Sequence, residues 1–122
     1  MNATAIPVPE LICQLLDAAD GIPADTAAAE LIISHGHFLH RGAFRRTISV
    51  CNGQPLASIA WDAALHVLDA GLLPCASSEQ AILRIAASLG DPAVPLCLRA
   101  VLGNLDRRNL HLVTAAITTA NG

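Results

Sequence analysis

One short segment, HGHFLHRGAFRR from His35 to Arg46, concentrates the polar chemistry of the chain. It holds three of the five histidines, three of the seven arginines and both phenylalanines, in a chain that has no lysine. Imidazole and guanidinium groups form charge-assisted hydrogen bonds to anionic or polar partners. The candidate binding residues are therefore His37, His40, Arg41, Arg45 and Arg46.

Three histidines of this segment, His35, His37 and His40, also have the chemistry of metal ligands. Imidazole binds zinc, copper or nickel. On a continuous helix, positions 37 and 40 share a face whereas positions 35 and 37 do not, so a common ion requires a break at Gly36. A zinc site also needs a fourth protein ligand or a water molecule. The spacing matches no established metal motif, and we expect no cofactor.

The arginines of the segment have the chemistry of phosphate ligands. A helix would align Arg41 with Arg45, and exposed phenylalanines could stack on bases. With so few aromatic residues, we expect Phe38 and Phe44 in the core instead. The formal net charge of −3 also disfavours a nucleic-acid partner. A nucleic-acid-binding regulator that uses segment 35–46 is the alternative function, and a histidine-based metal-binding protein is the second alternative.

The sequence contains no complete catalytic motif. Asp62, His66 and Asp69 follow helical spacing, which could orient an imidazole for proton transfer. Neither a serine nor a cysteine lies in a nucleophile turn of the G-x-S-x-G type, and phosphate-loop signatures are absent. The sequence leaves enzymatic activity open and favours binding without catalysis.

The composition predicts a helical interior and an apolar surface. Hydrophobic residues make up 53% of the 122 residues, and charged residues make up 14%. A small domain cannot bury so many apolar groups, so we expect a homodimer or another protein partner. The alanine-rich, lysine-free composition indicates a GC-rich bacterial genome. With no apolar run of about 20 residues and no signal peptide, we expect a cytoplasmic protein without membrane contact.

The four cysteines, Cys13, Cys51, Cys75 and Cys97, have spacings that match neither zinc nor redox motifs. Each cysteine lies in or beside an apolar stretch. We therefore expect buried, reduced thiols that act as small hydrophobic side chains.

Hydrophobic periodicity predicts a compact all-α domain of five or six short helices over residues 9–122, after a flexible tail over 1–8. Helices are expected near residues 9–20, 25–35, 61–70, 78–89, 95–102 and 104–120. In the last helix, Leu110, Val113 and Ile117 are expected to face inward. Residues 37–51 are ambiguous, because Phe44, Ile48 and Cys51 follow helical spacing whereas the β-branched residues of 47–50 favour a short strand.

These observations predict a small non-catalytic protein that acts as an interaction or regulatory module. Its apolar face would pair with a second copy or with another protein. The polar segment 35–46 would then set the specificity of that contact.

Overall fold

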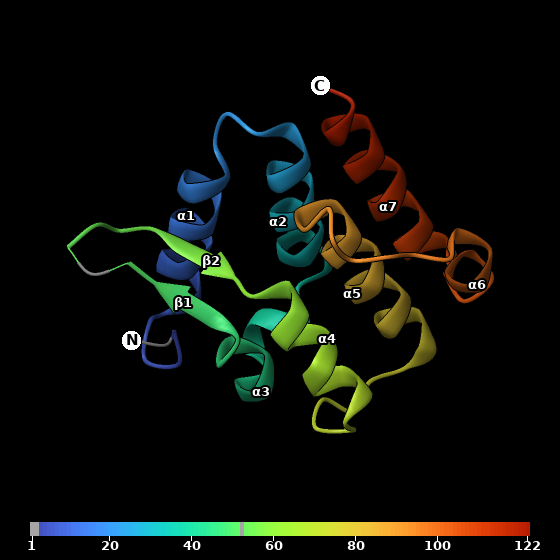
Figure 1. Cartoon of the computed structure of the whole chain (residues 1–122), viewed down its shortest axis with the longest axis horizontal. Helices are drawn as coiled ribbons and strands as arrows, with labels where there is room; N and C mark the ends of the chain where they lie inside the picture. Colours follow the sequence, from blue (N-terminus) through green and yellow to red (C-terminus); the bar gives the residue numbers. More distant parts are fainter. Residues whose placement is uncertain (1–2, 52) are drawn as a thin grey trace.

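The computed structural model describes residues 3–51 and 53–122 of the chain, and these form mostly helices (Figure 1). The elements are α1 (Val8–Ala19), α2 (Pro23–His35), a 3₁₀ helix (Phe38–His40), α3 (Gly42–Arg45), β1 (Ile48–Val50), β2 (Ala57–Ile59), α4 (Trp61–Asp69), α5 (Ser77–Gly90), α6 (Leu98–Leu102) and α7 (Arg107–Ala120). The mostly helical architecture is confirmed. The all-α description with five or six helices is wrong, because the described residues contain seven α-helices and a two-stranded sheet. None of these helices is long and apolar enough to cross a membrane.

Helix α2 lies at the centre of the molecule. It packs against α1 on one side and against α5 and α7 on the other (Figure 1). Its buried residues come from several sides of the helix: Ala27, Ala28, Ala29, Leu31, Ile32 and His35. A helix that is apolar on several sides is typical of an interior position, and small alanine side chains let the neighbouring helices approach closely. The sequence of α2 therefore accounts for its central place.

One proline and one glycine set the ends of α2. The helix begins at Pro23, two residues earlier than expected, because the fixed φ angle of proline suits the first helical turn. Thr26 lies inside the helix, and its hydroxyl donates to the carbonyl of Ala19 at 2.9 Å. Gly36 ends the helix with a φ of 83°, a left-handed conformation that favours glycine. The chain can then turn directly into the polar segment.

Residues 47–51 do not continue a helix, which corrects the helical interpretation of their spacing. Strands β1 and β2 pair antiparallel in the register Ile48↔Ile59, Ser49↔Ser58 and Val50↔Ala57. Helix α3 has already ended at Arg45, and both the backbone N–H and the hydroxyl of Thr47 donate to the Phe44 carbonyl. The strand alternative for residues 47–50 is therefore confirmed over Ile48–Val50, whereas Thr47 lies in the preceding turn.

The N-terminal residues make specific contacts with the rest of the molecule. Met1 and Asn2 lie outside the described residues, whereas Ala3 is fully buried. The Arg45 guanidinium donates to the carbonyl of Ala3 at 2.9 Å and to the carbonyl of Ile6. These contacts hold the backbone of residues 3–6 against α3. A flexible tail over 1–8 and a single domain over 9–122 stay predictions.

The centre of the core contains the two phenylalanines. Phe38 and Phe44 are both fully buried, and their ring centroids lie 5.4 Å apart. The other large buried side chains are aliphatic: Leu11, Leu31, Ile32, Leu39, Ile48, Leu73, Ile82, Leu83 and Val113. The prediction that both phenylalanines belong to the core is confirmed.

Candidate functional site

The segment His35–Arg46 does not form one continuous surface. It spans the end of α2, the 3₁₀ helix and α3, three short elements that point its side chains in different directions. Its members therefore divide between an internal polar network, a contact with the N-terminal residues, and exposed positions.

His37, Arg41 and Glu79 form a connected set that we call the His37 network. The Nδ1 atom of His37 lies 3.1 Å from the Glu79 carboxylate, and its Nε2 atom lies 2.9 Å from the Arg41 guanidinium. Because a guanidinium only donates hydrogen bonds, Nε2 must accept one. The proton of a neutral His37 is therefore on Nδ1, which donates to Glu79. The imidazole is held in a single tautomer.

The His37 network joins the end of α2 to the beginning of α5. The second carboxylate oxygen of Glu79 accepts a hydrogen bond from the backbone N–H of Ala76 at 2.8 Å. Arg41 also donates to the carbonyl of Pro74 at 2.8 Å. Both imidazole nitrogens of His37 are thus occupied by protein groups. This arrangement indicates a structural clamp rather than a free general base or metal ligand.

The remaining predicted binding residues are separated from the His37 network. Arg45 is directed to the carbonyls of Ala3 and Ile6. His40 and Arg46 are exposed, and no side-chain hydrogen bond is found for either within residues 3–51 and 53–122. Phe38 and Phe44 are fully buried, so neither ring is available to stack on a base. Little free positive charge remains for a phosphate partner.

The three candidate metal ligands do not converge. His35 is buried, His37 is held in its network and His40 is exposed. The ring centroids of His35 and His37 lie 6.0 Å apart with the rings perpendicular. In the part of the chain that the structure describes, no three histidine, cysteine or acidic side chains are placed to hold one ion. The geometry gives the metal alternative no support.

His35 is buried at the end of α2, close to Arg108. Burial lowers the pKa of His35 below its ordinary value of 6.5, and the nearby Arg108 guanidinium lowers it further, against an opposing effect of Glu79. Arg108 itself donates to the carbonyls of Ser34 and His35, the last two residues of α2. A cation in this position also interacts favourably with the helix C-terminus.

We expect the free energy of unfolding to fall as the pH decreases below about 6.5. The unfolded chain takes up a proton on His35 in that range, whereas the folded chain resists protonation until a lower pH. Thermal unfolding at about pH 7.5 and about pH 5.5 measures this loss. His35→Gln should lose less stability on acidification than the control His111→Gln, which changes an exposed histidine. Equal losses in the two variants would contradict the assignment to His35.

The cysteines are more exposed than their apolar surroundings suggest. Cys13, Cys51 and Cys97 are exposed, and Cys75 is half-buried. The expectation of four buried thiols is therefore wrong, because three of them are exposed and Cys75 is only partly buried. Burial and the Glu79 carboxylate raise the pKa of the Cys75 thiol, which disfavours a reactive thiolate there. No disulfide is formed among the four cysteines.

Helix α7 carries an apolar face that the sequence did not reveal. Val113 is buried as expected, but Leu110 and Ile117 are 48% and 55% exposed, so their predicted inward orientation is wrong. Thr114 donates its hydroxyl to the Leu110 carbonyl at 2.9 Å, and Thr118 donates to the Thr114 carbonyl at 3.1 Å. We call this surface, formed by Leu110, Thr114, Ile117 and Thr118, the α7 outer face.

Comparison of the chain with protein-family models, with curated proteins and with solved structures found no match. A function must therefore be inferred from the chain's own residues. Among its surfaces, the α7 outer face combines large apolar side chains with hydroxyls that already have partners. That combination is typical of a contact surface.

Proposed function

We propose that the protein is a non-catalytic interaction module that forms a homodimer through the α7 outer face. The observation that carries this proposal is an uncharged helix face whose hydroxyls bond to their own helix. From Asn109 to Gly122 the sequence contains no acidic residue and no arginine, and His111 is the only titratable side chain. Among the residues that the structure describes, no helix or strand covers the outer side of α7 (Figure 1).

Burial of this face would remove apolar area from water without leaving polar groups unpaired. Leu110 and Ile117 are seven residues apart and project from the same side of α7. Complete burial of one such side chain stabilises by roughly 1.5–3 kcal/mol, and a symmetric dimer would bury four of them in part. The hydroxyls of Thr114 and Thr118 already donate to carbonyls of their own helix. The usual penalty for desolvating a hydroxyl is therefore avoided.

A second copy of the chain suits this face better than a charged partner. An uncharged face meets its own copy across a twofold axis without electrostatic repulsion. If the two helices run antiparallel, each Arg107 lies near the C-terminal end of the other copy's α7. The carbonyl groups at that end favour a cation. The same charge at the N-terminus of its own helix is unfavourable, so the dimer would relieve it.

The size of the face predicts a dimer of modest affinity. A helix of 14 residues is about 21 Å long. Two such helices bury less than the roughly 1,600 Å² of a standard interface. The exposed residues Leu98 and Leu102 of α6, which adjoins the beginning of α7 (Figure 1), would add to it. We therefore expect dissociation in the micromolar range.

The polar segment 35–46 has a different role in this proposal from the one expected at first. The His37 network and the Arg45 contacts support the fold, which leaves His40 and Arg46 as its exposed basic groups. The specificity of the contact would instead come from the shape of the α7 outer face. No described contact favours nucleic acid or metal as a second function.

The variant Ile117→Arg should remain monomeric where the unmodified chain dimerises. It places a charge from each copy within the apolar contact, and an arginine in the last turns of a helix does not disfavour the helix. Sedimentation equilibrium from low to high micromolar concentration measures the change. The unmodified chain should shift from monomer to dimer, and Ile117→Arg should not.

The matched control is Leu72→Arg. Leu72 is 63% exposed in the turn between α4 and α5, away from α7 (Figure 1). This variant adds the same charge at a leucine that is at least as exposed as Ile117, and it should dimerise normally. A monomer at every concentration, or an equal effect of the two substitutions, would overturn the proposal.

A further inference from the structure

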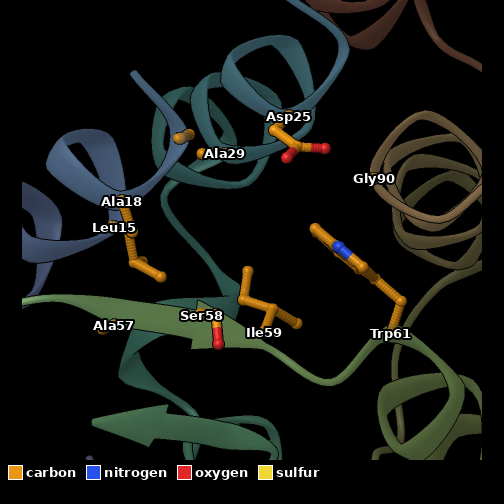
Figure 2. A pocket seen from close by; sticks show the side chains of 10 residues that line it. Leu15, Ala18, Asp25, Ala29, Ala57, Ser58, Ile59, Trp61 and Gly90 are labelled. Atoms are coloured by element: carbon orange, nitrogen blue, oxygen red, sulfur yellow. The ribbon is translucent and has the colours of Figure 1, made fainter. Parts of the chain in front are cut away.

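A pocket of about 150 Å³ lies on the opposite side of α2 from α7 (Figures 1 and 2). It forms where the C-terminal ends of α1 and α5 approach the first turns of α2 and α4, beside β2. No lining residue comes from α6 or α7. The pocket is therefore separate from the proposed dimer contact.

The pocket combines apolar walls with a single carboxylate. Leu15 and Ile59 contribute aliphatic surface, and Trp61 is the only tryptophan in the chain. Asp25 is the only charged lining residue. In Figure 2 the Asp25 carboxylate and the outer end of the Trp61 indole project into the same space. No ion pair is found for Asp25 among the described residues.

The lack of a side chain at Gly90 makes room for the Trp61 indole. A Cβ atom added at this glycine would lie 2.5 Å from Cε2 of Trp61 and closer still to Nε1. The indole therefore lies directly against the backbone at the end of α5. With Ile59 also beside it, the ring is a fixed wall of the pocket rather than a loose surface side chain.

The surroundings of the pocket carry negative charge. Asp25 lines the pocket, and Asp17, Asp20, Asp62 and Asp91 lie within two sequence positions of a lining residue, whereas none of the seven arginines does. Glu30 also follows a lining residue, but its carboxylate faces α7, where it accepts a hydrogen bond from Thr119. Charges of one sign around a concave surface raise the local concentration of ligands of the opposite sign. The pocket thus favours a cation over an anion.

We propose that this pocket binds a small alkylammonium ion. The Asp25 carboxylate would hold the cationic group, and the alkyl groups would pack against Trp61 and Ile59. Carboxylate pairing and an adjacent aromatic ring both favour an organic cation over a neutral molecule of the same shape. A cavity of about 150 Å³ holds a molecule the size of benzene, so the ligand has about six non-hydrogen atoms. This inference goes beyond the proposed dimer and does not depend on it.

Titration of the full chain with tetramethylammonium chloride tests the proposal. Because the chain has one tryptophan and no tyrosine, its fluorescence reports directly on the pocket. We expect a saturable change with tetramethylammonium. Sodium chloride at equal ionic strength and tert-butanol, a neutral molecule of similar size, should give no saturable change. This comparison uses the unmodified chain and needs no variant.

Two variants locate the site, because each removes one carboxylate charge, one inside the pocket and one outside it. Asp25→Asn should weaken binding by about tenfold or more, because the carboxylate that holds the cation is lost. Glu10→Gln, near the beginning of α1 and outside the pocket, should bind like the unmodified chain. Absence of saturation in the unmodified chain, equal binding of tert-butanol, or equal affinity of the two variants would overturn the proposal.

Discussion

Replacement of Phe38 by alanine is expected to lower the free energy of unfolding by about 3–5 kcal/mol. The Phe38 ring is fully buried, and its centroid lies 5.4 Å from both the Phe44 ring and the His35 ring. Its removal would leave a cavity between the end of α2 and α3. Small domains are stable by only about 5–15 kcal/mol, so the loss is a large part of the total.

Urea unfolding followed by helical circular dichroism measures this loss. The control Phe38→Leu keeps most of the buried volume and should lose less than about 1.5 kcal/mol. A Phe38→Ala variant within about 1 kcal/mol of the unmodified chain would show that the surrounding side chains collapse into the space. In that case the aromatic pair would not be central to stability.

The variant Gly90→Ala is expected to lower the free energy of unfolding by about 1–3 kcal/mol. Within a helix, alanine is normally better than glycine by about 1 kcal/mol. At this position the added methyl group would overlap the Trp61 indole, so the ring or the end of α5 must move. The overlap should outweigh the gain in helix propensity. Displacement of the ring should also change the tryptophan fluorescence.

A double-mutant cycle with Trp61→Ala separates the overlap from other effects of the substitution. Once the indole is absent, Gly90→Ala should become neutral or stabilising by up to about 1 kcal/mol. Gly103→Ala is the matched control, because a Cβ atom at that glycine meets no atom within 4 Å. It should not destabilise the chain. The same loss in both Trp61 backgrounds would rule out the overlap as its cause.

Most of the helices could be predicted from the sequence because prolines, glycines and apolar spacing agree locally. The hairpin of β1 and β2 could not be predicted in this way. Phe44 and Ile48 follow helical spacing, yet they are buried by two different elements, a short helix and a strand. The partner strand Ala57–Ile59 contains a single β-branched residue, so its sequence does not indicate a strand. It forms because β1 pairs with it and α1 packs against it.

The candidate sites were harder to predict because their members are distant in sequence. The sequence indicates His37 and Arg41 as candidate binding residues, but their partners, Glu79 and the carbonyl of Pro74, belong to a later part of the chain. The orientation of α7 was also ambiguous, because apolar residues occur on more than one side of it. Periodicity favours Leu110 and Ile117 as inward residues, whereas α2 and α5 cover the side with Asn109, Val113 and Ala116. Which side is covered depends on the neighbouring helix.

The central position of α2 has a consequence for how the molecule unfolds. Helices α1, α5 and α7 each use α2 as a packing surface, and α2 buries residues toward all of them. If α2 lost its structure, each of these helices would expose apolar area at the same moment. Partly open forms without α2 would keep only smaller contacts, such as those of α1 with β2 and of α4 with α5, and should therefore be unfavourable. The fold should melt as one cooperative unit, and a fragment that lacks residues 23–35 should remain a random coil.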